Sequence, residues 1–446
     1  MKKIFDKCRF VFDTLEKSGF ECYAVGGCVR DMLLGLTPHD IDFTTNANPD
    51  EILQCFSEYK TFELGKKFGT ISVLNQSEIY EITTYRIDGE YSDSRHPDKV
   101  EFSRNLRDDL SRRDFTVNAM AMDKDGVVVD IFNGKADLEN KLIRAVGNAE
   151  KRFSEDALRI FRALRFSAKL GFIIEESTSD ACKNLAYLLD NVHPQRLRDE
   201  LSSFIIGDNV TELMTEYREV FARIIPELKH SFDFSQITAH HRYDVFTHTV
   251  KAVGFAPKNA KIRIALLLHD IAKPLCHTTD RAGISHFNGH PQKSADIATE
   301  ILRRFSFPSD FVNSVVKLIK YHDVRFEKPQ LHIKQLLMEL SEEEFRCLLT
   351  IQRCDILAQS EYQKEEKLRH VDYIEDEFEA VLRENACLKL SDLSINGNDI
   401  MSLGVKGKIV GDILHNLLTM VMEDKLVNQK DVLINYTKEY ISQIDK

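Results

Sequence analysis

The chain has 446 residues, of which 43% are hydrophobic and 29% charged, and its formal net charge is −11. This length predicts two to four domains rather than one core, and the composition is that of an ordinary globular protein. No apolar run approaches the roughly 20 residues needed to cross a bilayer, which argues against a membrane protein. The acidic balance disfavours a simple RNA-binding scaffold, because contacts with phosphates need Lys and Arg.

The first twenty residues, MKKIFDKCRFVFDTLEKSGF, contain neither a continuous apolar segment nor a small-residue cleavage site. Their pattern predicts an amphipathic helix rather than a signal peptide, so we expect a cytoplasmic protein. The nine cysteines are scattered and none forms a CxxC pair, which argues against a zinc knuckle or a thioredoxin-type site. We expect buried free thiols in a reducing compartment.

The predicted elements change in kind along the chain. Residues 22–130 alternate short β-type runs with turns and helices, which indicates an α/β or α+β region. From about residue 150, apolar residues recur with the 3.6-residue period of a helix, so the remainder should be nearly all helical. Domain boundaries are expected in the stretches 132–141, 224–236 and 382–392.

The first motif is AVGGCVRDMLLGLTPHDIDFTT, residues 24–45. An apolar run ends at Gly26 and Gly27, and a helix-type segment begins at Cys28; two glycines at such a junction allow close approach to an anion. Asp40 and Asp42 flank Ile41 in a short β-run, so both carboxylates should lie on one face while Ile41 enters the core. Paired carboxylates suit Mg²⁺ together with substrate phosphates, although two solvated acids on a strand edge are the plain alternative.

The second motif is DLSRRDFTVNAMAMD, residues 109–123. Arg112 and Arg113 can hold a triphosphate, and Asp114 and Asn118 can bind ribose hydroxyls. A helix cap with solvated arginines explains the same residues equally well.

The third motif is FSEDALRIFRALRFSAKLGF, residues 153–172, with Ser154 as the expected N-cap of a helix. Asp156, Arg159 and Arg162 recur at a spacing that drifts slowly around one face. Spacing alone favours a surface ladder of ion pairs over a recognition surface. Basic residues are in local excess between 141 and 170, and that excess could face a polyanion.

Together these motifs resemble those of class II tRNA nucleotidyltransferases, the CCA-adding enzymes and their bacterial poly(A) polymerase relatives. The resemblance covers about residues 20–205, with order and spacing preserved. It is carried by GGCVRD (26–31), LLG (33–35), PHDIDF (38–43), YRIDGEYSDSRHP (85–97), RRDFTVNA (112–119), DIFNG (130–134), EDALRIFR (155–162) and QRLRDE (195–200).

The resemblance implies an α+β fold in which a polymerase-beta-like nucleotidyltransferase head is followed by an all-helical neck, body and tail. The expected domains are a catalytic head at 1–140, a neck for base and RNA recognition at 141–225, a body at 226–385 and a tRNA-binding tail at 386–446. The implied partners are tRNA, CTP and ATP.

The resemblance also assigns roles to residues. Asp40 and Asp42 would bind catalytic Mg²⁺, and Gly26, Gly27 and Arg30 would line the triphosphate path. Arg112, Arg113, Asp114 and Asn118 would hold the incoming nucleotide. Asp156 and Arg159 would pair with the Watson–Crick edge of CTP or ATP, supported by Arg162. One departure concerns the segment that usually begins Glu-Arg in this family, which here begins Gln195-Arg196, so its role stays open.

Members of this family add CCA, CC, A or poly(A). The CC-adding forms lack a flexible loop before the RRDF segment, whereas Asp88 to Pro97 keeps the loop pattern here. We therefore expect complete CCA addition to tRNA from CTP and ATP with release of pyrophosphate. A-adding or poly(A) activity is the alternative.

A separate pattern begins at His240 and resembles the HD superfamily of metal-dependent phosphohydrolases. Adjacent His269 and Asp270 end an apolar helix, with His248 upstream and Asp355 downstream. These ligands suit Mn²⁺, Ni²⁺ or Fe²⁺, and His286, His290 and His322 could complete a second metal position.

The HD resemblance implies a possible phosphatase or 2′,3′-cyclic phosphodiesterase that repairs tRNA ends, or a domain that only supports RNA binding. A competing hypothesis for the whole chain is an HD phosphohydrolase whose N-terminal domain merely binds nucleotide or RNA. The pair Asp40 and Asp42, with Arg113, favours the transferase. Oligomeric state is not predicted.

Overall fold

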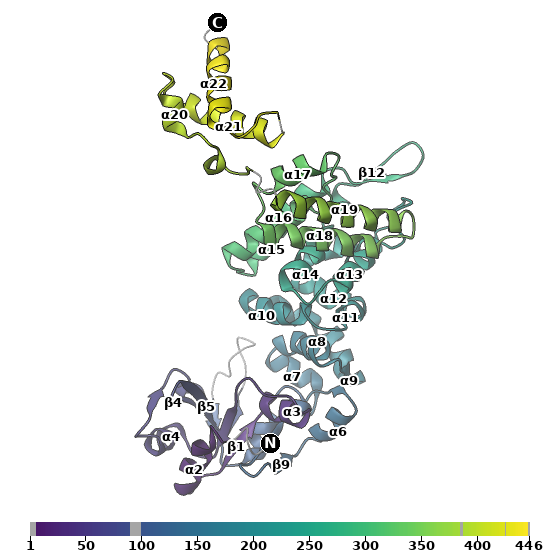
Figure 1. Cartoon of the computed structure of the whole chain (residues 1–446). Helices are drawn as coiled ribbons and strands as arrows, with labels where there is room; N and C mark the ends of the chain where they lie inside the picture. Colours follow the sequence, from purple (N-terminus) through teal and green to yellow (C-terminus); the bar gives the residue numbers. More distant parts are fainter. Residues whose placement is uncertain (1–5, 90–99, 384–386, 424, 445–446) are drawn as a thin grey trace. The chain divides into compact units, whose positions relative to one another are not determined.

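The computed structural model describes residues 6–89, 100–383, 387–423 and 425–444 (Figure 1). The chain divides into two compact units. Met1–Lys229 with Arg304–Ser306 is called the N-terminal unit, and His230–Arg303 with Phe307–Lys446 is called the C-terminal unit. Of the loop segment Asp88 to Pro97, residues 90–97 lie outside the described residues.

Among the described residues of the N-terminal unit, seven strands form one mixed sheet in the order β3-β4-β5-β2-β1-β8-β9. Strands β2 and β5 run parallel, and the other neighbours are antiparallel. The strands are β1 (Cys22–Val25), β2 (Asp42–Thr45), β3 (Lys60–Phe62), β4 (Thr70–Asn75), β5 (Glu78–Thr84), β8 (Met120–Met122) and β9 (Val128–Asp130). A separate hairpin pairs β6 (Arg86–Asp88) with β7 (Val100–Phe102).

Short helices accompany the sheet: α2 (Arg9–Lys17), α3 (Gly27–Leu33), α4 (Pro49–Cys55), α5 (Leu106–Ser111), α6 (Gly134–Glu139) and the 3₁₀ turn η2 (Thr116–Asn118). The amphipathic N-terminal helix predicted from the sequence is α2. Its apolar side packs on the sheet, where the Phe12 and Phe43 rings meet edge-on at 5.2 Å. The connections β1–α3 and α5–η2 carry the predicted site residues Gly26, Arg112, Arg113 and Asp114.

The rest of the N-terminal unit is mainly helical: α7 (Ala149–Glu155), α8 (Leu158–Leu170), α9 (Glu176–Asn184), α10 (Pro194–Ile205), α11 (Val210–Glu216) and α12 (Arg218–Ile224), with a short pair of strands, β10 (Leu142–Ile143) and β11 (Ile173–Ile174). Phe161, Phe204 and Phe221 form an aromatic core between these helices, with ring centroids 5.0–5.8 Å apart. This core fixes α8 against α10, so polar residues on both helices are held at constant separation.

The expectation that Ser154 caps a single helix was wrong. Ser154 lies inside α7, where its hydroxyl donates to the Glu150 carbonyl, and the helix is interrupted before α8. Asp156 ends α7, and its Oδ1 accepts a hydrogen bond from the amide of Leu158, the first residue of α8. A short acceptor side chain at that position competes with continuation of one helix.

The C-terminal unit is built on α13 (Val245–Phe255), α14 (Ala260–Leu268), α15 (His290–Arg304), α16 (Ser309–Tyr321), α17 (Pro329–Leu336), α18 (Glu342–Ala358) and α19 (Lys364–Arg383). A small hairpin joins β12 (Thr278–Thr279) to β13 (Ser285–His286). All of 262–268 in α14 is buried, as expected for a helix surrounded by others. The end of α14 therefore delivers its next residues into the interior of the bundle.

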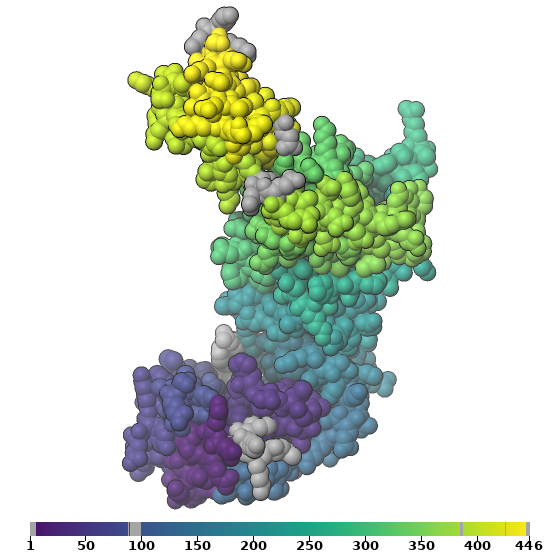
Figure 2. All heavy atoms as spheres, viewed as in Figure 1, coloured from purple at the N-terminus to yellow at the C-terminus, as the bar shows by residue number. Residues whose placement is uncertain are grey.

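The last helices are α20 (Gly397–Met401), α21 (Lys408–Met422) and α22 (Lys430–Ile444). They enclose an apolar cluster of their own, and their outer surface forms the yellow end of the chain in Figure 2. Its buried members are Leu393, Ile395, Ile400, Ile413, Leu417, Leu418, Met422 and Leu433.

The α+β head followed by helical regions is confirmed. No helix within the described ranges has the length and apolar character needed to cross a membrane. All nine cysteines are free, and six of them are buried.

Candidate active site and candidate metal centre

The turn between β1 and α3 depends on Gly26, which has φ +85°. A Cβ atom added at Gly26 would lie 3.1 Å from Arg113 Nη1. Glycine therefore satisfies both the backbone conformation and the close approach of the guanidinium. The predicted glycine turn and the predicted RRDF segment thus meet in space.

Asp42 is the first residue of β2, while Asp40 and Ile41 precede the strand. Ile41 is only half-buried, so its predicted place in the core was wrong; the strand begins one residue after it. Although Asp42 is exposed, partial enclosure by protein and the charges of Asp40 and Glu81 raise its pKa to about 6, against the opposing effect of Arg113. The two predicted carboxylates are therefore close enough to repel each other.

Asp109 anchors both arginines of the RRDF segment. Arg112 Nη2 lies 2.7 Å from Asp109 Oδ1, and Arg113 Nη2 lies 3.1 Å from Asp109 Oδ2. The side chain of Asp109 is fully buried. The spacing of Asp109 to these arginines, i to i+3 and i+4, was a usable signal for this pairing that the motif-based assignment missed. Arg113 Nε is buried without a hydrogen-bond partner, so this guanidinium keeps unused donor capacity.

Asp114 and Asn118 belong to a buried chain of hydrogen bonds. Arg30 Nη1 donates to Asn118 Oδ1 at 2.7 Å, and Asn118 Nδ2 donates to Asp114 Oδ1 at 3.1 Å. Arg162 then contacts Asp114 Oδ2 through Nη2 at 2.6 Å. Burial would raise the pKa of Asp114, but the charge and hydrogen bonds of Arg162 outweigh it and lower the pKa to about 2.

A second carboxylate, Glu200 on α10, continues this chain. It accepts from Arg165 Nε at 2.5 Å and lies 3.4 Å from Arg162 Nη1. The guanidinium carbons of Arg30, Arg162 and Arg165 lie 5.1, 5.3 and 3.9 Å from the centroid of the Phe166 ring. Phe166 was not predicted as a site residue, and its surroundings could not be read from helical spacing because Arg30 comes from a distant segment.

Asp156 and Arg159, the predicted base-reading pair, both form contacts with other residues of the N-terminal unit. Asp156 Oδ2 lies 2.9 Å from Arg196 Nη2. Arg159 contacts Glu155 Oε2 at 3.1 Å and donates to the Arg112 carbonyl at 2.8 Å. This last bond ties α8 directly to the RRDF segment, so the second and third motifs form one continuous region.

The arginines in the basic stretch 141–170 are each paired with carboxylates. The pairs are Arg144 with Asp137 and Glu175, Arg152 and Arg159 with Glu155, Arg162 with Asp114 and Glu200, and Arg165 with Glu200. The local excess of positive charge seen in the sequence is therefore largely compensated by these acids.

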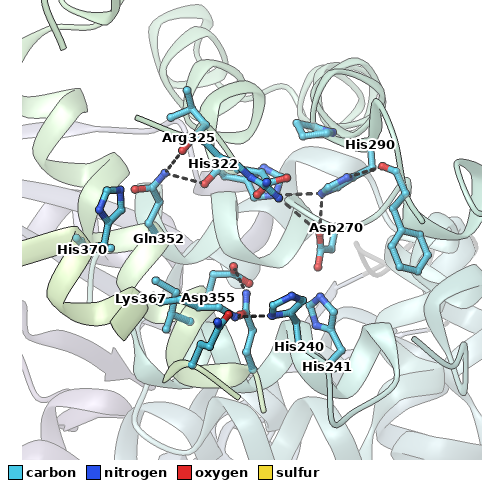
Figure 3. A pocket seen from close by; sticks show the side chains of 18 of the residues that line it. His240, His241, Asp270, His290, His322, Arg325, Gln352, Asp355, Lys367 and His370 are labelled. Atoms are coloured by element: carbon cyan, nitrogen blue, oxygen red, sulfur yellow. Dashed lines mark hydrogen bonds and ion pairs between the residues drawn. The ribbon is translucent and has the colours of Figure 1, made fainter. Parts of the chain in front are cut away.

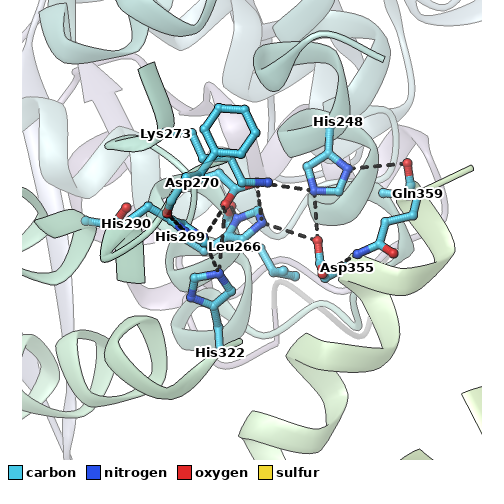
Figure 4. A network of polar contacts seen from close by, with 12 residues as sticks. His248, Leu266, His269, Asp270, Lys273, His290, His322, Asp355 and Gln359 are labelled. Carbon is cyan, nitrogen blue, oxygen red and sulfur yellow. Dashed lines mark hydrogen bonds and ion pairs between the residues drawn. The ribbon is translucent and has the colours of Figure 1, made fainter. Parts of the chain in front are cut away.

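In the C-terminal unit, His248, His269, Asp270 and Asp355 converge from α13, the end of α14 and α18 (Figure 4). His248 Nε2 lies 2.8 Å from Asp355 Oδ1, and His269 Nε2 lies 3.2 Å from Asp270 Oδ2. One ligand atom from each of the four residues falls within 4.8 Å of the others. The four residues predicted from sequence are therefore brought together.

A second group shares Asp270 with the first and adds His290 and His322. Asp270 Oδ1 lies 3.3 Å from His290 Nε2 and 3.8 Å from His322 Nε2. His286 was wrongly included in this set: it is exposed on β13 and pairs with Asp280 at 3.0 Å, because the hairpin carries it away from Asp270.

The rings of four histidines are oriented in the same way, namely those of His248, His269, His290 and His322. Their Nδ1 atoms lie 2.6–3.3 Å from backbone carbonyl oxygens, of Ala358, Leu266, Phe287 and Ile319. A carbonyl can only accept, so Nδ1 carries a proton and Nε2 is the ring nitrogen that faces the centre.

Several of these inward-facing atoms lack hydrogen bonds. His248 Nε2, His269 Nε2 and both carboxylate oxygens of Asp270 are buried without a hydrogen-bond partner among the described residues, although Lys273 Nζ forms an ion pair with Asp270 Oδ2 at 2.7 Å. Buried unsatisfied acceptors are costly, and this donor set of imidazoles and carboxylates fits divalent transition metals.

A cavity of about 1240 Å³ opens beside this cluster (Figure 3). Asp270, His290, His322 and Asp355 line it, together with basic side chains that include Arg325 and Lys367. The cluster is therefore accessible to a ligand of nucleotide size.

Three family models match the chain. The Poly A polymerase head domain matches residues 22–144, and the Probable RNA and SrmB-binding site of polymerase A matches residues 171–232. A model of tRNA nucleotidyltransferase domain 2 matches residues 284–437. These matches cover the sheet, the helices α9 to α12 and much of the C-terminal unit, and they leave out α7 and α8.

Similar proteins extend over the full length. The CCA-adding enzyme of Ligilactobacillus salivarius (strain UCC118) is 33% identical, over 98% of this chain and 97% of that enzyme. The CCA-adding enzyme of Staphylococcus haemolyticus (strain JCSC1435) is 31% identical, over 98% and 99% respectively. A crystal structure of the Bacillus stearothermophilus CCA-adding enzyme in complex with CTP covers 100% of this chain and 99% of its own, with 26% identity and a TM-score of 0.73. On this full-length similarity, joined to the motifs assembled around Gly26, Asp42 and Arg113, the chain belongs to the family of CCA-adding enzymes.

Proposed function

We propose that this protein adds CCA to the 3′ end of tRNA, taking C from CTP and A from ATP and releasing pyrophosphate. The observation that carries the proposal is the meeting of Asp42, Arg113 and the Gly26 turn in a chain that matches CCA-adding enzymes along its whole length. The protein is a nucleotidyltransferase, and its family implies use of a divalent metal.

Asp40 and Asp42 are the proposed ligands of that metal, with Mg²⁺ as the ion. Their donor chemistry fits, because hard carboxylate oxygens suit Mg²⁺ and because the raised pKa of Asp42 reflects nearby negative charge that a cation would relieve. When bound there, a divalent cation supplies the positive charge that activates the attacking 3′-hydroxyl and stabilises the leaving pyrophosphate.

The other residues position the nucleotide in this proposal. Gly26 lets the guanidinium of Arg113 lie close against the turn, where it would bind the phosphate chain. Gly27, Arg30 and Arg112 extend the triphosphate path, while Asp114 and Asn118 face the ribose. Asp156 and Arg159 read the base, with Arg162 holding Asp114 in its ionised form.

The test uses three tRNAs that lack A, CA or CCA, supplied with CTP, ATP or both. Complete restoration of the shortest tRNA, dependent on both nucleotides, is expected. Incorporation of A alone would instead identify an A-adding or poly(A) enzyme.

Two variants test the carboxylates in the same assay. Asp40→Ala and Asp42→Ala should abolish transfer while leaving tRNA binding intact, whereas Asp125→Ala, in an exposed turn of the same unit, should transfer normally. Full transfer by either of the first two variants would refute the metal assignment.

A second activity, metal-dependent phosphohydrolysis of the HD type, is favoured by the cluster at Asp270. The supporting observation is the set of buried acceptors without hydrogen bonds beside a large cavity. Mn²⁺, Ni²⁺ or Fe²⁺ would suit the ligands His248, His269, Asp270 and Asp355, and a metal bound there would supply an activated water to a phosphate ester.

The phosphohydrolase is tested on tRNA ends bearing a 2′,3′-cyclic phosphate, with each metal in turn. Hydrolysis should disappear in His269→Ala and Asp270→Ala. Activity that survives both changes would come from a contaminant, and absence of activity with every metal would leave the cluster a structural one.

A further inference from the structure

The cavity beside the cluster at Asp270 has a second polar wall, which carries none of the proposed metal ligands. This wall is formed by α19 and by the segment before α13, and Lys367 and His240 meet on it (Figure 3). We propose that Lys367 and His240 form a phosphate subsite, which binds the phosphodiester that joins the terminal nucleotide of a substrate to the nucleotide before it. This inference rests on the proposed phosphohydrolase and names its substrate class, the end of a nucleotide chain rather than a mononucleotide.

The first argument concerns the hydrogen bonds of Lys367. Its Nζ donates to Gln359 Oε1 at 2.6 Å and to His240 Nδ1 at 3.0 Å. An ammonium group has three donors, so one N–H remains without an acceptor among the described residues. Both acceptors are neutral, and Lys367 forms no ion pair with any carboxylate in the described part of the chain. Lys367 is therefore a cation with a fixed position, an unused donor and no counterion.

The position of this cation has a cost that a bound anion would relieve. Lys367 is half-buried, and burial lowers the pKa of its ammonium group, with the charge of Asp355 acting in the opposite direction. Charges that are partly removed from water are usually paired. Asp355 is not the partner of Lys367, because the amide of Gln359 lies between them and donates to Asp355 Oδ2 at 2.9 Å. An anion in the cavity would supply the missing counterion.

His240 adds a second donor to the same wall. Because an ammonium group can only donate, His240 Nδ1 accepts from Lys367, and Nε2 carries the ring proton. This Nε2 has no hydrogen-bond partner within the described ranges. The residue is held in place, since its carbonyl accepts from the Ser360 amide at 2.9 Å and its ring lies edge-on to Tyr362 at 5.0 Å. Lys367 and His240 thus offer two N–H donors, which suit the two unesterified oxygens of a phosphodiester.

The subsite lies one side chain away from the proposed metal ligands. Gln359 accepts from Lys367 through Oε1 and donates to Asp355 through Nε2, so a single amide group spans the separation. Neighbouring phosphates of a nucleotide chain are separated by one sugar, which is a span of similar size. The cavity volume of about 1240 Å³ exceeds the roughly 300–1,000 Å³ that is usual for small-ligand pockets. A terminal phosphate at the cluster therefore leaves room for the preceding phosphodiester beside Lys367.

The other charged residues of the cavity outside the cluster do not form a comparable site. Five of them are exposed, namely Arg325, Arg369, Asp323, Glu327 and Glu366. Two of these are cations and three are anions, so their charges nearly cancel. Lys367 differs from them because it is half-buried and its Nζ is held by two neutral acceptors.

The experiment compares two ligands that differ only in the charge of the internucleotide linkage. Both are dinucleotides that end in a 3′-phosphonomethyl group, which cannot be hydrolysed. One has the natural phosphodiester between its nucleotides, and the other has an uncharged methylphosphonate. The terminal base is 4-thiouracil, and the full-length protein is loaded with Mn²⁺. Near-ultraviolet cross-linking to peptides of the C-terminal unit then gives the half-saturating concentration at this site, without contribution from ligand bound to the head.

The wild type should bind the phosphodiester ligand about tenfold more tightly than the methylphosphonate, because the neutral linkage loses a charge-assisted hydrogen bond. Lys367→Met should bind the two ligands equally, because the cation that distinguishes them is absent. Both ligands carry the same terminal group, so their ratio within one protein is insensitive to any effect of the substitution on the cluster through Gln359.

Lys364→Met is the matched control. Lys364 begins the same helix, pairs with Glu361 and does not line the cavity, so the wild-type preference should remain. His240→Phe keeps a ring beside Tyr362 and removes the Nε2 donor, so it should reduce the preference. Circular dichroism and thermal unfolding establish that each variant is folded. If Lys367→Met does not fold, Lys367→Gln, which keeps a donor toward Gln359, takes its place.

Equal affinity of the wild type for the two ligands, or an undiminished preference in Lys367→Met, would overturn the inference. No step of this comparison requires hydrolysis. A preference that depends on Lys367, without hydrolysis by any metal, would remove the proposed phosphohydrolase and retain the subsite. Hydrolysis of cyclic phosphate ends without such a preference would retain the phosphohydrolase and remove the subsite.

Discussion

Arg196 and Asp156 are joined by two parallel contacts between α10 and the junction of α7 with α8. Arg196 Nη2 lies 2.9 Å from Asp156 Oδ2, and Nη1 lies 3.3 Å from Oδ1. The forked geometry fixes the plane of the carboxylate as well as its position. Since Oδ1 also accepts from the Leu158 amide, a residue proposed to read the base is already held in one orientation before a nucleotide arrives.

The first prediction follows from this pair. Replacing Arg196 with Lys removes one of the two parallel contacts and frees Asp156 to rotate, since Lys cannot form the planar fork. We expect the KM for CTP and for ATP to rise about tenfold, the equivalent of about 1.4 kcal/mol, with a smaller change in kcat. Misincorporation of UTP should rise as well, because the orientation of Asp156 selects the base edge.

Arg198→Ala is the control for the Arg196 variant. It lies on the same helix but contacts its neighbour Asp199 and the Ser306 carbonyl. Its kinetics should match the wild type. An Arg196→Lys enzyme with unchanged KM and unchanged selectivity would show that the pair serves only to join the helices.

The second prediction concerns the pH dependence of stability at Asp114. Its pKa is lowered from 3.8 to about 2 in the folded protein, chiefly by Arg162 against the cost of burial. A carboxyl group with a depressed folded-state pKa stabilises the fold above its ordinary pKa and loses that contribution as the pH falls toward the folded value. The contribution is about 2 kcal/mol at neutral pH and should vanish between about pH 4 and pH 2.

Urea unfolding of wild type and Asp114→Asn measures this directly. The free energies of unfolding should differ by about 2 kcal/mol at pH 7, and the gap should narrow as the pH drops below 4. A gap that stays constant down to pH 2.5 would mean that Asp114 is protonated over the whole range.

Local patterns in the sequence were sufficient to predict part of the structure. The glycine turn at Gly26, the strand carrying Asp42 and the buried helix that ends at His269 each depend on neighbours within a few residues. Period-2 and period-3.6 patterns capture such neighbours, which is why the mixed region of strands and helices and the helical remainder were predicted correctly, while the α+β class came from the family resemblance. The motifs added the order in which functional residues occur.

Contacts between segments that are far apart in the sequence could not be predicted from local patterns. The prediction that Ser154 caps a helix was wrong because Asp156 interrupts the helix by accepting a hydrogen bond from the Leu158 amide. Helical spacing does not reveal such competition between a side chain and the helix backbone. Arg196 could not be assigned a role because its partner lies 40 residues away. His286 was grouped with His290 by proximity in sequence, yet the β12–β13 hairpin turns it toward Asp280.

The third prediction tests the stack around Phe166. This ring is almost fully buried and has three guanidinium groups within 5.3 Å of its centroid. Phe166→Leu keeps most of the apolar volume and removes the ring face that attracts the cations, so it should destabilise the fold by about 2–3 kcal/mol. Thermal or urea unfolding provides the measurement.

Phe172→Leu is the matched comparison, because Phe172 is similarly buried and has no cation–π contact within the ranges that the structure describes. Its loss should be about 1 kcal/mol smaller, the difference being due to the cations. Equal losses of unfolding free energy in the two variants would show that Phe166 stabilises the fold only as an ordinary core residue.

The fourth prediction concerns the side chains that orient Asp355. Gln359 Nε2 donates to Asp355 Oδ2 at 2.9 Å, and Lys367 Nζ donates to Gln359 Oε1 at 2.6 Å, so Asp355 Oδ1 is left facing His248 and His269. Side chains that hold a metal ligand from behind typically affect metal affinity by about 10- to 100-fold. Gln359→Leu should therefore weaken Mn²⁺ binding by the group of His248, His269, Asp270 and Asp355 by at least tenfold while leaving the fold intact.

The measurement is Mn²⁺ titration in an Asp40→Asn, Asp42→Asn background, which removes the proposed metal ligands of the head, with Gln352→Leu for comparison. Gln352 donates to the carbonyls of His322 and Val324 and does not contact Asp355, so its loss should leave Mn²⁺ binding by that group unchanged. A loss of affinity in Gln359→Leu but not in Gln352→Leu would show that Gln359 supports Asp355 as a metal ligand. If Gln359→Leu retained full affinity, Asp355 would be oriented by the histidines alone, and Gln359 would serve to hold Lys367 alone.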